Sequence, residues 1–404
     1  MSGAENYLSV TGSSTIAGPL SNLGGLEFDG PVTLGNTVTM GASGRVDFAS
    51  TIDGTIPGAE GLTVDTGGTA EFDGQVGGTA ELLSLTVNGN TALDCPYIGL
   101  NGEADFNGPG YFDNTGTVPA SGLVIQATTA RFAGYFGPNG NAGIGIDGDA
   151  VFGGGVGLLQ GGLVVSGDLT NTSGTFNGPP AGEDFWVGGD FSMAAGTFRD
   201  QGATLTMDGD DQGLSTGGAA LSALEIESTG TVTAENALNI DGALTLDMGG
   251  TLDLHGNAVG AGSVSGPGAL TDSGAAAALT VAPGSSDTFA GALTGTAGLT
   301  LGSGTLVLSG TSTNTGPTTV TSGTLEGDGT LSASPVSVAS GATFDGSGTA
   351  ASLTAASGAT VTPGHPIGIM HVAGPVTLDS GSNLDIAING TAAGTTYSQL
   401  SDTA

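Results

Sequence analysis

Basic residues are almost missing from this 404-residue sequence, which has three arginines, no lysine, 38 acidic residues and a formal net charge of -35. A surface this acidic repels nucleic acid and anionic lipid, so the expected partners include no nucleic acid and no membrane. The single cysteine, Cys95, excludes an internal disulfide. Such a composition suits an extracellular or salty setting in which divalent cations screen the charge.

Long helices are also excluded, because the chain has 79 glycines and 16 prolines. Glycine costs about 1 kcal/mol relative to alanine inside a helix, and few stretches of ten residues lack it. The same composition would suit a disordered chain, but the apolar residues follow a pattern rather than being sparse. The sequence therefore favours an ordered fold in which helix is not the main element.

The four letters EFDG occur at residues 27 to 30 and again at 71 to 74. The looser pattern Phe-x-Gly accounts for most of the phenylalanines. It is found at Phe28, Phe72, Phe106, Phe132, Phe152, Phe176, Phe289 and Phe344. Spacings in the low twenties that vary in length are typical of the coils of a solenoid.

Short alternating segments fill the sequence between these motifs. LTVDTGGTAEFDG (62 to 74) and LTLGSGTLVLSG (299 to 310) alternate apolar with small polar residues and break at Gly, Asn or Asp. This pattern predicts strands of three to six residues. A sandwich or barrel would also use short strands, but at this length it would normally divide into linked domains. We therefore expect an all-β fold, a parallel beta-helix (β-solenoid) of roughly 18 coils with about 22 residues each, forming a single elongated rod.

The composition changes once along the chain. From about residue 260 onward phenylalanine becomes rare and Ala, Ser, Thr and Gly dominate. We expect two sections of solenoid, a Phe/Gly/Asp-rich section over residues 1–260 and a narrower one over residues 261–404.

GLTLGSGTLVLSGTSTNTGPTTVTSGTLEGDGTL (298 to 331) and the residues after it closely resemble the autotransporter-associated beta-strand repeat. The family pattern combines a Gly-Thr-Leu strand, an Asn-Thr-Gly turn, a Thr-Thr-Val strand and a Pro-Gly step. The matching positions are Gly304 to Leu306, Asn314 to Gly316, Thr318 to Val320, and Pro363 with Gly364.

FDGPVTLGNTVTMGASGRVDFASTIDG (28 to 54) resembles the repeats of filamentous-haemagglutinin-type surface proteins. Together the two resemblances imply a right-handed parallel beta-helix exported to a bacterial cell surface, and they imply no enzyme. Members of these families carry a signal peptide, whereas MSGAENYLSV (1 to 10) has neither a basic start nor an apolar core. We therefore expect a segment of a longer protein, or a short chain that assembles end to end.

Two acidic turns are candidate calcium sites. Asp208, Asp210 and Asp211 fall within MDGDDQG, although the twelfth position of an EF-hand loop would be Ala219, which offers no carboxylate. Asp147 lies in AGIGIDGDA, a lone copy of a calcium-binding nonapeptide pattern. Solvated acidic turns are the simpler interpretation of both. No cofactor is expected other than Ca²⁺ at these positions.

Catalysis is the main competing class. Parallel beta-helices include polysaccharide lyases and hydrolases, but a lyase needs basic residues and a sugar platform needs aromatics, and both are scarce here. The sequence thus predicts no enzyme. It predicts a structural protein of the bacterial cell surface or extracellular space that forms a fibre, a surface layer or an adhesin stalk. Its expected partners are further copies of itself, head to tail or laterally, or cell-surface glycans. The alternative is a polysaccharide-binding or polysaccharide-degrading beta-helix.

Overall fold

The computed structural model describes residues 6–113, 122–139, 143–227 and 229–402. Within these ranges the chain has no helix, and therefore no helical segment that could cross a bilayer. It forms a parallel β-solenoid of about 18 turns over most of its length. The expected all-β parallel solenoid and its number of coils are confirmed. The right-handed sense of the beta-helix and the single elongated rod remain predictions.

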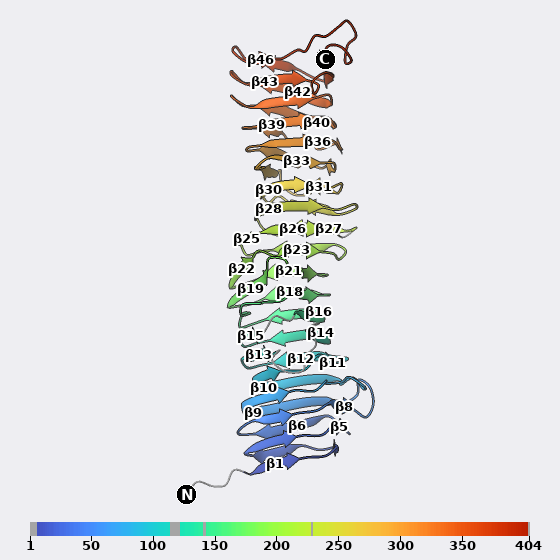
Figure 1. Cartoon of the computed structure of the whole chain (residues 1–404), viewed down its shortest axis with the longest axis vertical. Helices are drawn as coiled ribbons and strands as arrows, with labels where there is room; N and C mark the ends of the chain where they lie inside the picture. Colours follow the sequence, from blue (N-terminus) through green and yellow to red (C-terminus); the bar gives the residue numbers. More distant parts are fainter. Residues whose placement is uncertain (1–5, 114–121, 140–142, 228, 403–404) are drawn as a thin grey trace. The chain divides into compact units, whose positions relative to one another are not determined.

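The chain divides into two compact units, Met1–Thr204 (unit 1) and Leu205–Ala404 (unit 2). Each unit is a stack of coils built from short strands. Figure 1 shows the strands of unit 1, coloured from blue to green, stacked coil upon coil. The expected change from one solenoid section to another near residue 260 stays a prediction. At this position β30 (Val259–Ser265) pairs with a strand of the preceding coil and a strand of the following coil, so the stack of unit 2 is continuous there.

The strands of unit 1 follow one another in the order β1 Tyr7–Val10, β2 Ser14–Ile16, β3 Leu20–Leu23, β4 Gly25–Phe28, β5 Val32–Leu34, β6 Val38–Ala42, β7 Val46–Phe48, β8 Ile52–Gly54, β9 Gly61–Phe72, β10 Ser84–Leu93, β11 Tyr97–Gly99, β12 Glu103–Phe106, β13 Gly110–Asp113, β14 Leu123–Phe132, β15 Phe136–Asn139, β16 Ile144–Phe152, β17 Leu163–Val165, β18 Leu169–Asn171, β19 Thr175–Pro180, β20 Phe185–Val187, β21 Phe191–Met193 and β22 Thr197–Gln201.

Those of unit 2 begin with β23, which starts at the boundary, and are β23 Thr204–Met207, β24 Gln212–Ser215, β25 Ala220–Leu221, β26 Ala223–Ile226, β27 Thr231–Ala234, β28 Leu238–Leu246, β29 Thr251–Asp253, β30 Val259–Ser265, β31 Ala269–Thr271, β32 Ala278–Val281, β33 Ser286–Phe289, β34 Ala292–Leu293, β35 Gly298–Leu301, β36 Thr305–Leu308, β37 Thr311–Ser312, β38 Thr318–Val320, β39 Thr324–Gly327, β40 Thr330–Val338, β41 Thr343–Gly346, β42 Thr349–Ala355, β43 Thr360–Pro363, β44 Ile369–Val372, β45 Val376–Leu378, β46 Asn383–Leu384 and β47 Gln399–Asp402.

Coil length varies within each unit. In unit 1 Leu8 pairs with Leu26 while Ala104 pairs with Ala130, so the coils range at least from 18 to 26 residues. In unit 2 Val336 pairs with Leu353, only 17 residues later. Because the loops between strands absorb these differences, most strands still pair with an equivalent strand in the next coil.

The core consists of the inward positions of successive coils. All eight phenylalanines of the Phe-x-Gly motif are buried, as the motif predicts. In unit 1 Phe28, Phe48 and Phe72 stack with ring centroids 5.3 and 5.2 Å apart. The stacking distance is close to the spacing of parallel strands, about 4.8 Å, so in these three coils one aromatic ring per coil fills the interior. The outward positions are left for polar residues and for function.

Candidate functional site around His365

The site is built on the outward face of a sheet in unit 2. Strands β39, β41 and β43 pair in parallel, with Leu325, Phe344 and Val361 buried at the inward positions. The residues that follow each of these, Glu326, Asp345 and Thr362, share one register and lie on the opposite, outward face. Two carboxylates are thereby placed on neighbouring coils, with backbones about 4.8 Å apart.

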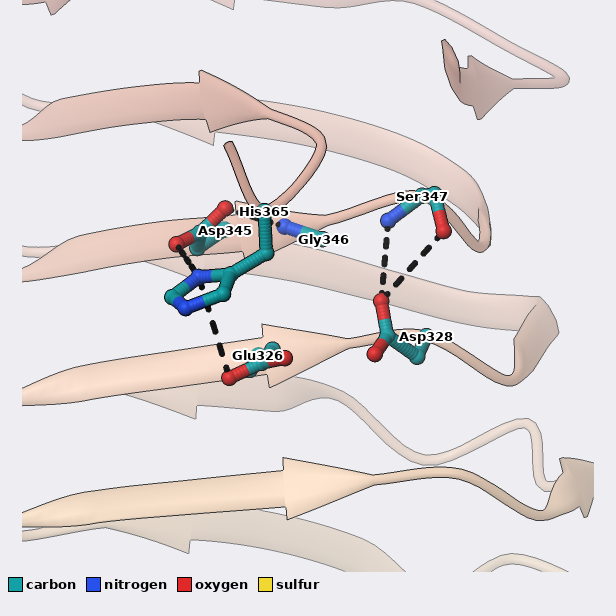
Figure 2. A network of polar contacts seen from close by, with 6 residues as sticks. All are labelled: Glu326, Asp328, Asp345, Gly346, Ser347 and His365. Atoms are coloured by element: carbon teal, nitrogen blue, oxygen red, sulfur yellow. Dashed lines mark hydrogen bonds and ion pairs between the residues drawn. The ribbon is translucent and has the colours of Figure 1, made fainter. Parts of the chain in front are cut away.

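His365 covers this pair of carboxylates from the turn after β43. Its Nδ1 lies 2.9 Å from Oδ2 of Asp345 and 4.0 Å from Oε2 of Glu326. Figure 2 shows the imidazole ring against Asp345, with Glu326 on the other side of Nδ1. The turn between β43 and β44 is thus tied to the two preceding coils by one side chain.

The surrounding charges favour the protonated imidazole. The hydrogen bond to Asp345 and the attraction of Glu326 and Asp345 raise the pKa of His365 above its ordinary value. Burial also raises the pKa of Glu326, although the positive charge on His365 opposes that shift. The backbone N–H of Gly346 donates to Asp345 Oδ1 at 2.6 Å, which fixes the orientation of that carboxylate. The group therefore favours a protonated His365 beside two carboxylates.

A cleft opens beside this group. It has a volume of about 380 Å³ and is lined by the polar residues Asp345, Thr362, His365 and Asp385 and by the apolar Pro366, Ile386 and Ala387, together with Gly364. Nearby, Asp328 accepts hydrogen bonds from the backbone N–H and the hydroxyl of Ser347, at 3.2 and 3.3 Å (Figure 2). Those two bonds stabilise the neighbouring turn, and neither Asp328 nor Ser347 lines the cleft.

Elsewhere in unit 2 a serine, a histidine and an aspartate meet. Ser273 Oγ donates to Asp253 Oδ2 at 2.5 Å, and His255 Nδ1 lies 3.3 Å from the same Oγ. In a catalytic relay the histidine stands between the serine and the carboxylate. Here the hydroxyl donates to the carboxylate directly, and Asp253 Oδ1 also accepts the backbone N–H groups of His255 and Ser273. These hydrogen bonds therefore hold the turn after β29 against the turn after β31 in the next coil.

Unit 1 contains a second ionic group, also on an outward face. Glu27, Asp47 and Glu71 share one register on β4, β7 and β9. Arg45 bridges two of them, with Nη2 at 3.0 Å from Asp47 and 2.5 Å from Glu71. Burial, only partly offset by Arg45, raises the pKa of Asp47 to about 6. Arg131 has a similar role, since it lies 3.4 Å from Glu103 and 3.6 Å from Asp105.

The predicted calcium ligands lie at exposed positions. Asp208, Asp210 and Asp211 fall in the loop between β23 and β24, where Asp211 Oδ1 accepts the backbone N–H of Thr231 at 3.3 Å. Asp147 belongs to unit 1, on β16, and accepts the hydroxyl of Ser166 at 3.0 Å. Binding of calcium to these residues stays a prediction.

One acidic group was not predicted. Carboxylate oxygens of Glu225, Glu227 and Asp247 lie within 4.8 Å of one another, close enough for one cation to touch all three. Burial and repulsion by the two neighbours raise the pKa of Glu225. Glu225 lies on β26 and Asp247 follows β28, the paired strand of the next coil. The relevant signal was therefore the register between coils, which a search for motifs within one segment does not use.

Comparisons with known proteins do not assign this chain to a family. No family model, no curated protein and no solved structure matches the chain. The resemblance to autotransporter and filamentous-haemagglutinin repeats therefore stays a prediction, while the parallel solenoid that it implies is the fold observed.

Proposed function

We propose that this chain is a structural solenoid of the bacterial cell surface or extracellular space, acting in a fibre, a surface layer or an adhesin stalk, and not as an enzyme. The observation that carries the proposal is the repeated coil. The inward positions stack aromatic and aliphatic side chains from coil to coil, and many of the outward polar groups hold neighbouring coils together. A stack of this kind resists local opening because each coil is covered on both sides.

The distribution of charge supports an extracellular setting. Acidic residues outnumber basic ones by 38 to three. Two of the three arginines, Arg45 and Arg131, lie against carboxylates of their own surface. Little positive charge is left to attract nucleic acid or anionic lipid, whereas divalent cations outside the cell would screen the acidic faces.

The terminal coils support association of one copy with another. In unit 2 Leu384 on β46 is 42% exposed, although its partner in the preceding coil, Val361, is fully buried. In unit 1 Leu8 and Val10 on β1 are only partly buried, although their partners Leu26 and Phe28 are at most 1% exposed. Among the described residues no strand pairs with the outer edge of β1 or β46, and inward-type side chains beside such an open edge are suited to adding strands from another copy head to tail.

Electron microscopy of the purified chain, with calcium and again with a chelator, tests this proposal. We expect fibres or layers, with loss of order on chelation if acidic faces are joined by calcium. The variant Leu384→Asp should abolish head-to-tail assembly by placing a charge on the last coil. Leu158→Asp, at an exposed position in unit 1, is the matched control. Single particles under all conditions would contradict self-assembly and would instead indicate that further residues of a longer chain cover these coils.

A further inference from the structure

Five outward positions in unit 1 form one continuous column. The register of β11, β14, β16, β17 and β20 places one residue per coil in line, and all five precede a buried residue of the same strand. Since successive strand residues point to opposite faces, these five positions lie on the outer face. We call this column the outer stripe. Its members are Tyr97, Val124, Gly145, Val164 and Trp186.

The composition of the outer stripe is unusual for this protein. It contains the only tryptophan and one of five tyrosines. Val124 is 38% and Val164 43% exposed. Another outward column of the same unit is acidic, with Glu27 beside Asp47. Exposed apolar side chains that line up over successive coils indicate a binding surface for a ligand or a partner.

Gly145 leaves the middle of the outer stripe without a side chain. Its φ does not lie in the left-handed region, and a β-carbon built there would approach only Val124 Cγ2, at 3.7 Å, and the Leu123 carbonyl oxygen, at 4.0 Å. Neither backbone conformation nor packing therefore requires glycine at this position. The outer stripe therefore has space for a ligand atom between Val124 and Val164, and an aromatic residue lies at each end of the column.

A row of polar groups runs beside the outer stripe, two residues farther along the strands. Gln126 pairs with Asp147 on the next coil, and Ser166 Oγ donates to Asp147 Oδ1 at 3.0 Å. The hydroxyl of Tyr97 donates to Gln126 Oε1 at 2.5 Å. The amide, carboxylate and hydroxyl groups are therefore held in fixed positions along one edge of the apolar column.

This combination fits one class of partner. A pyranose ring has apolar C–H faces, which pack on aromatic and aliphatic side chains, and hydroxyl edges, which bond to amides and carboxylates. A second copy of the chain is a poorer occupant of this lateral face, because the chain has only three basic residues to pair with Asp147, and the self-association proposed above uses the end strands instead. A basic partner would find only Asp147 as a carboxylate among the residues named. We propose that the outer stripe binds an uncharged polysaccharide along the stacking direction of unit 1, a role independent of the structural function proposed above.

Affinity electrophoresis of the whole chain through gels containing dextran, mannan, xylan or a soluble β-glucan tests the proposal. We expect at least one of the four to retard the protein and to shift the fluorescence of Trp186, the only tryptophan. Trp186→Ala should weaken binding at least tenfold. Gly145→Arg should do the same by placing a bulky, charged side chain between Val124 and Val164, and Val164→Thr should weaken binding without changing side-chain shape.

Leu158→Ala, exposed in the same unit but outside the outer stripe, is the control and should bind normally. Thermal melting followed by circular dichroism confirms that each variant is folded. Absence of retardation in all four gels would overturn the proposal, and so would retardation that all three stripe variants retain. A fluorescence shift that depends on protein concentration without sugar would assign the outer stripe to a second copy instead. Because the terminal coils are unchanged in these variants, assembly in electron microscopy is tested separately from binding.

Discussion

Gly329 lies directly against Gly310 of the preceding coil, and a β-carbon on Gly329 would come within 1.9 Å of the Gly310 carbonyl oxygen. The same contact joins Gly310 to Gly291 and Gly348 to Gly329, so that one glycine recurs every 19 residues through this part of unit 2. None of these glycines has a φ in the left-handed region. Close approach of successive backbones, rather than an unusual turn, is therefore the reason for glycine in this column.

Gly329→Ala should destabilise the protein strongly, because the added methyl group overlaps backbone atoms that belong to another coil. We expect a loss of about 3 kcal/mol or more in the free energy of unfolding, measured by urea denaturation followed by circular dichroism. Gly284→Ala is the matched control, since a β-carbon there would meet no atom within 4 Å. Equal stability of the two variants would show that the coils can separate at this column without cost.

Asp47→Asn should stabilise unit 1 at high pH. Asp47 is only 8% exposed, and burial raises its pKa from 3.8 to about 6. A carboxyl group whose pKa is higher in the folded state favours folding below its unfolded pKa, and this contribution is lost as pH rises through the folded pKa. We therefore expect Asp47→Asn to be more stable by about 1–3 kcal/mol near pH 8 and nearly neutral near pH 4.

Urea denaturation at the two pH values measures this difference. Asp29→Asn, which removes a carboxylate from an exposed corner of the same unit, is the control and should change stability little at either pH. A stability difference for Asp47→Asn that is the same at both pH values would exclude titration of Asp47 as the cause.

Much of the fold could be predicted from the sequence, because each coil repeats the same local chemistry. The Phe-x-Gly motif marks an inward ring followed by a corner, and Phe28, Phe72 and Phe106 are buried accordingly. Coil lengths could not be predicted individually. Ala104 and Ala130, which pair on successive coils, are 26 residues apart, whereas Leu8 and Leu26 are 18 apart, and no motif in the sequence marks this difference.

The candidate sites were harder to predict because they depend on register between coils. Glu326, Asp345 and His365 are spaced by about one coil each, so no motif within a short segment unites them. The outer stripe has the same character, since Tyr97 and Trp186 belong to different strands with no local signal in common. Asp208, Asp210 and Asp211 were found by sequence because they lie in one loop, and their role with calcium remains a prediction.

The pKa of His365 should fall toward its ordinary value of 6.5 in the variant Asp345→Asn, because the hydrogen bond from Nδ1 to a carboxylate is the largest cause of its elevation. Titration of the His365 ring signals by NMR measures this change, with His371 as the internal control. A histidine with a raised pKa stabilises the fold fully below its unfolded pKa and loses that contribution as pH rises through the folded value. Since the His365 side chain is 64% exposed, the contribution should be modest, about 0.5 kcal/mol. An unchanged His365 pKa in Asp345→Asn would mean that Glu326 alone keeps the His365 pKa raised. Glu326→Gln would then lower the His365 pKa.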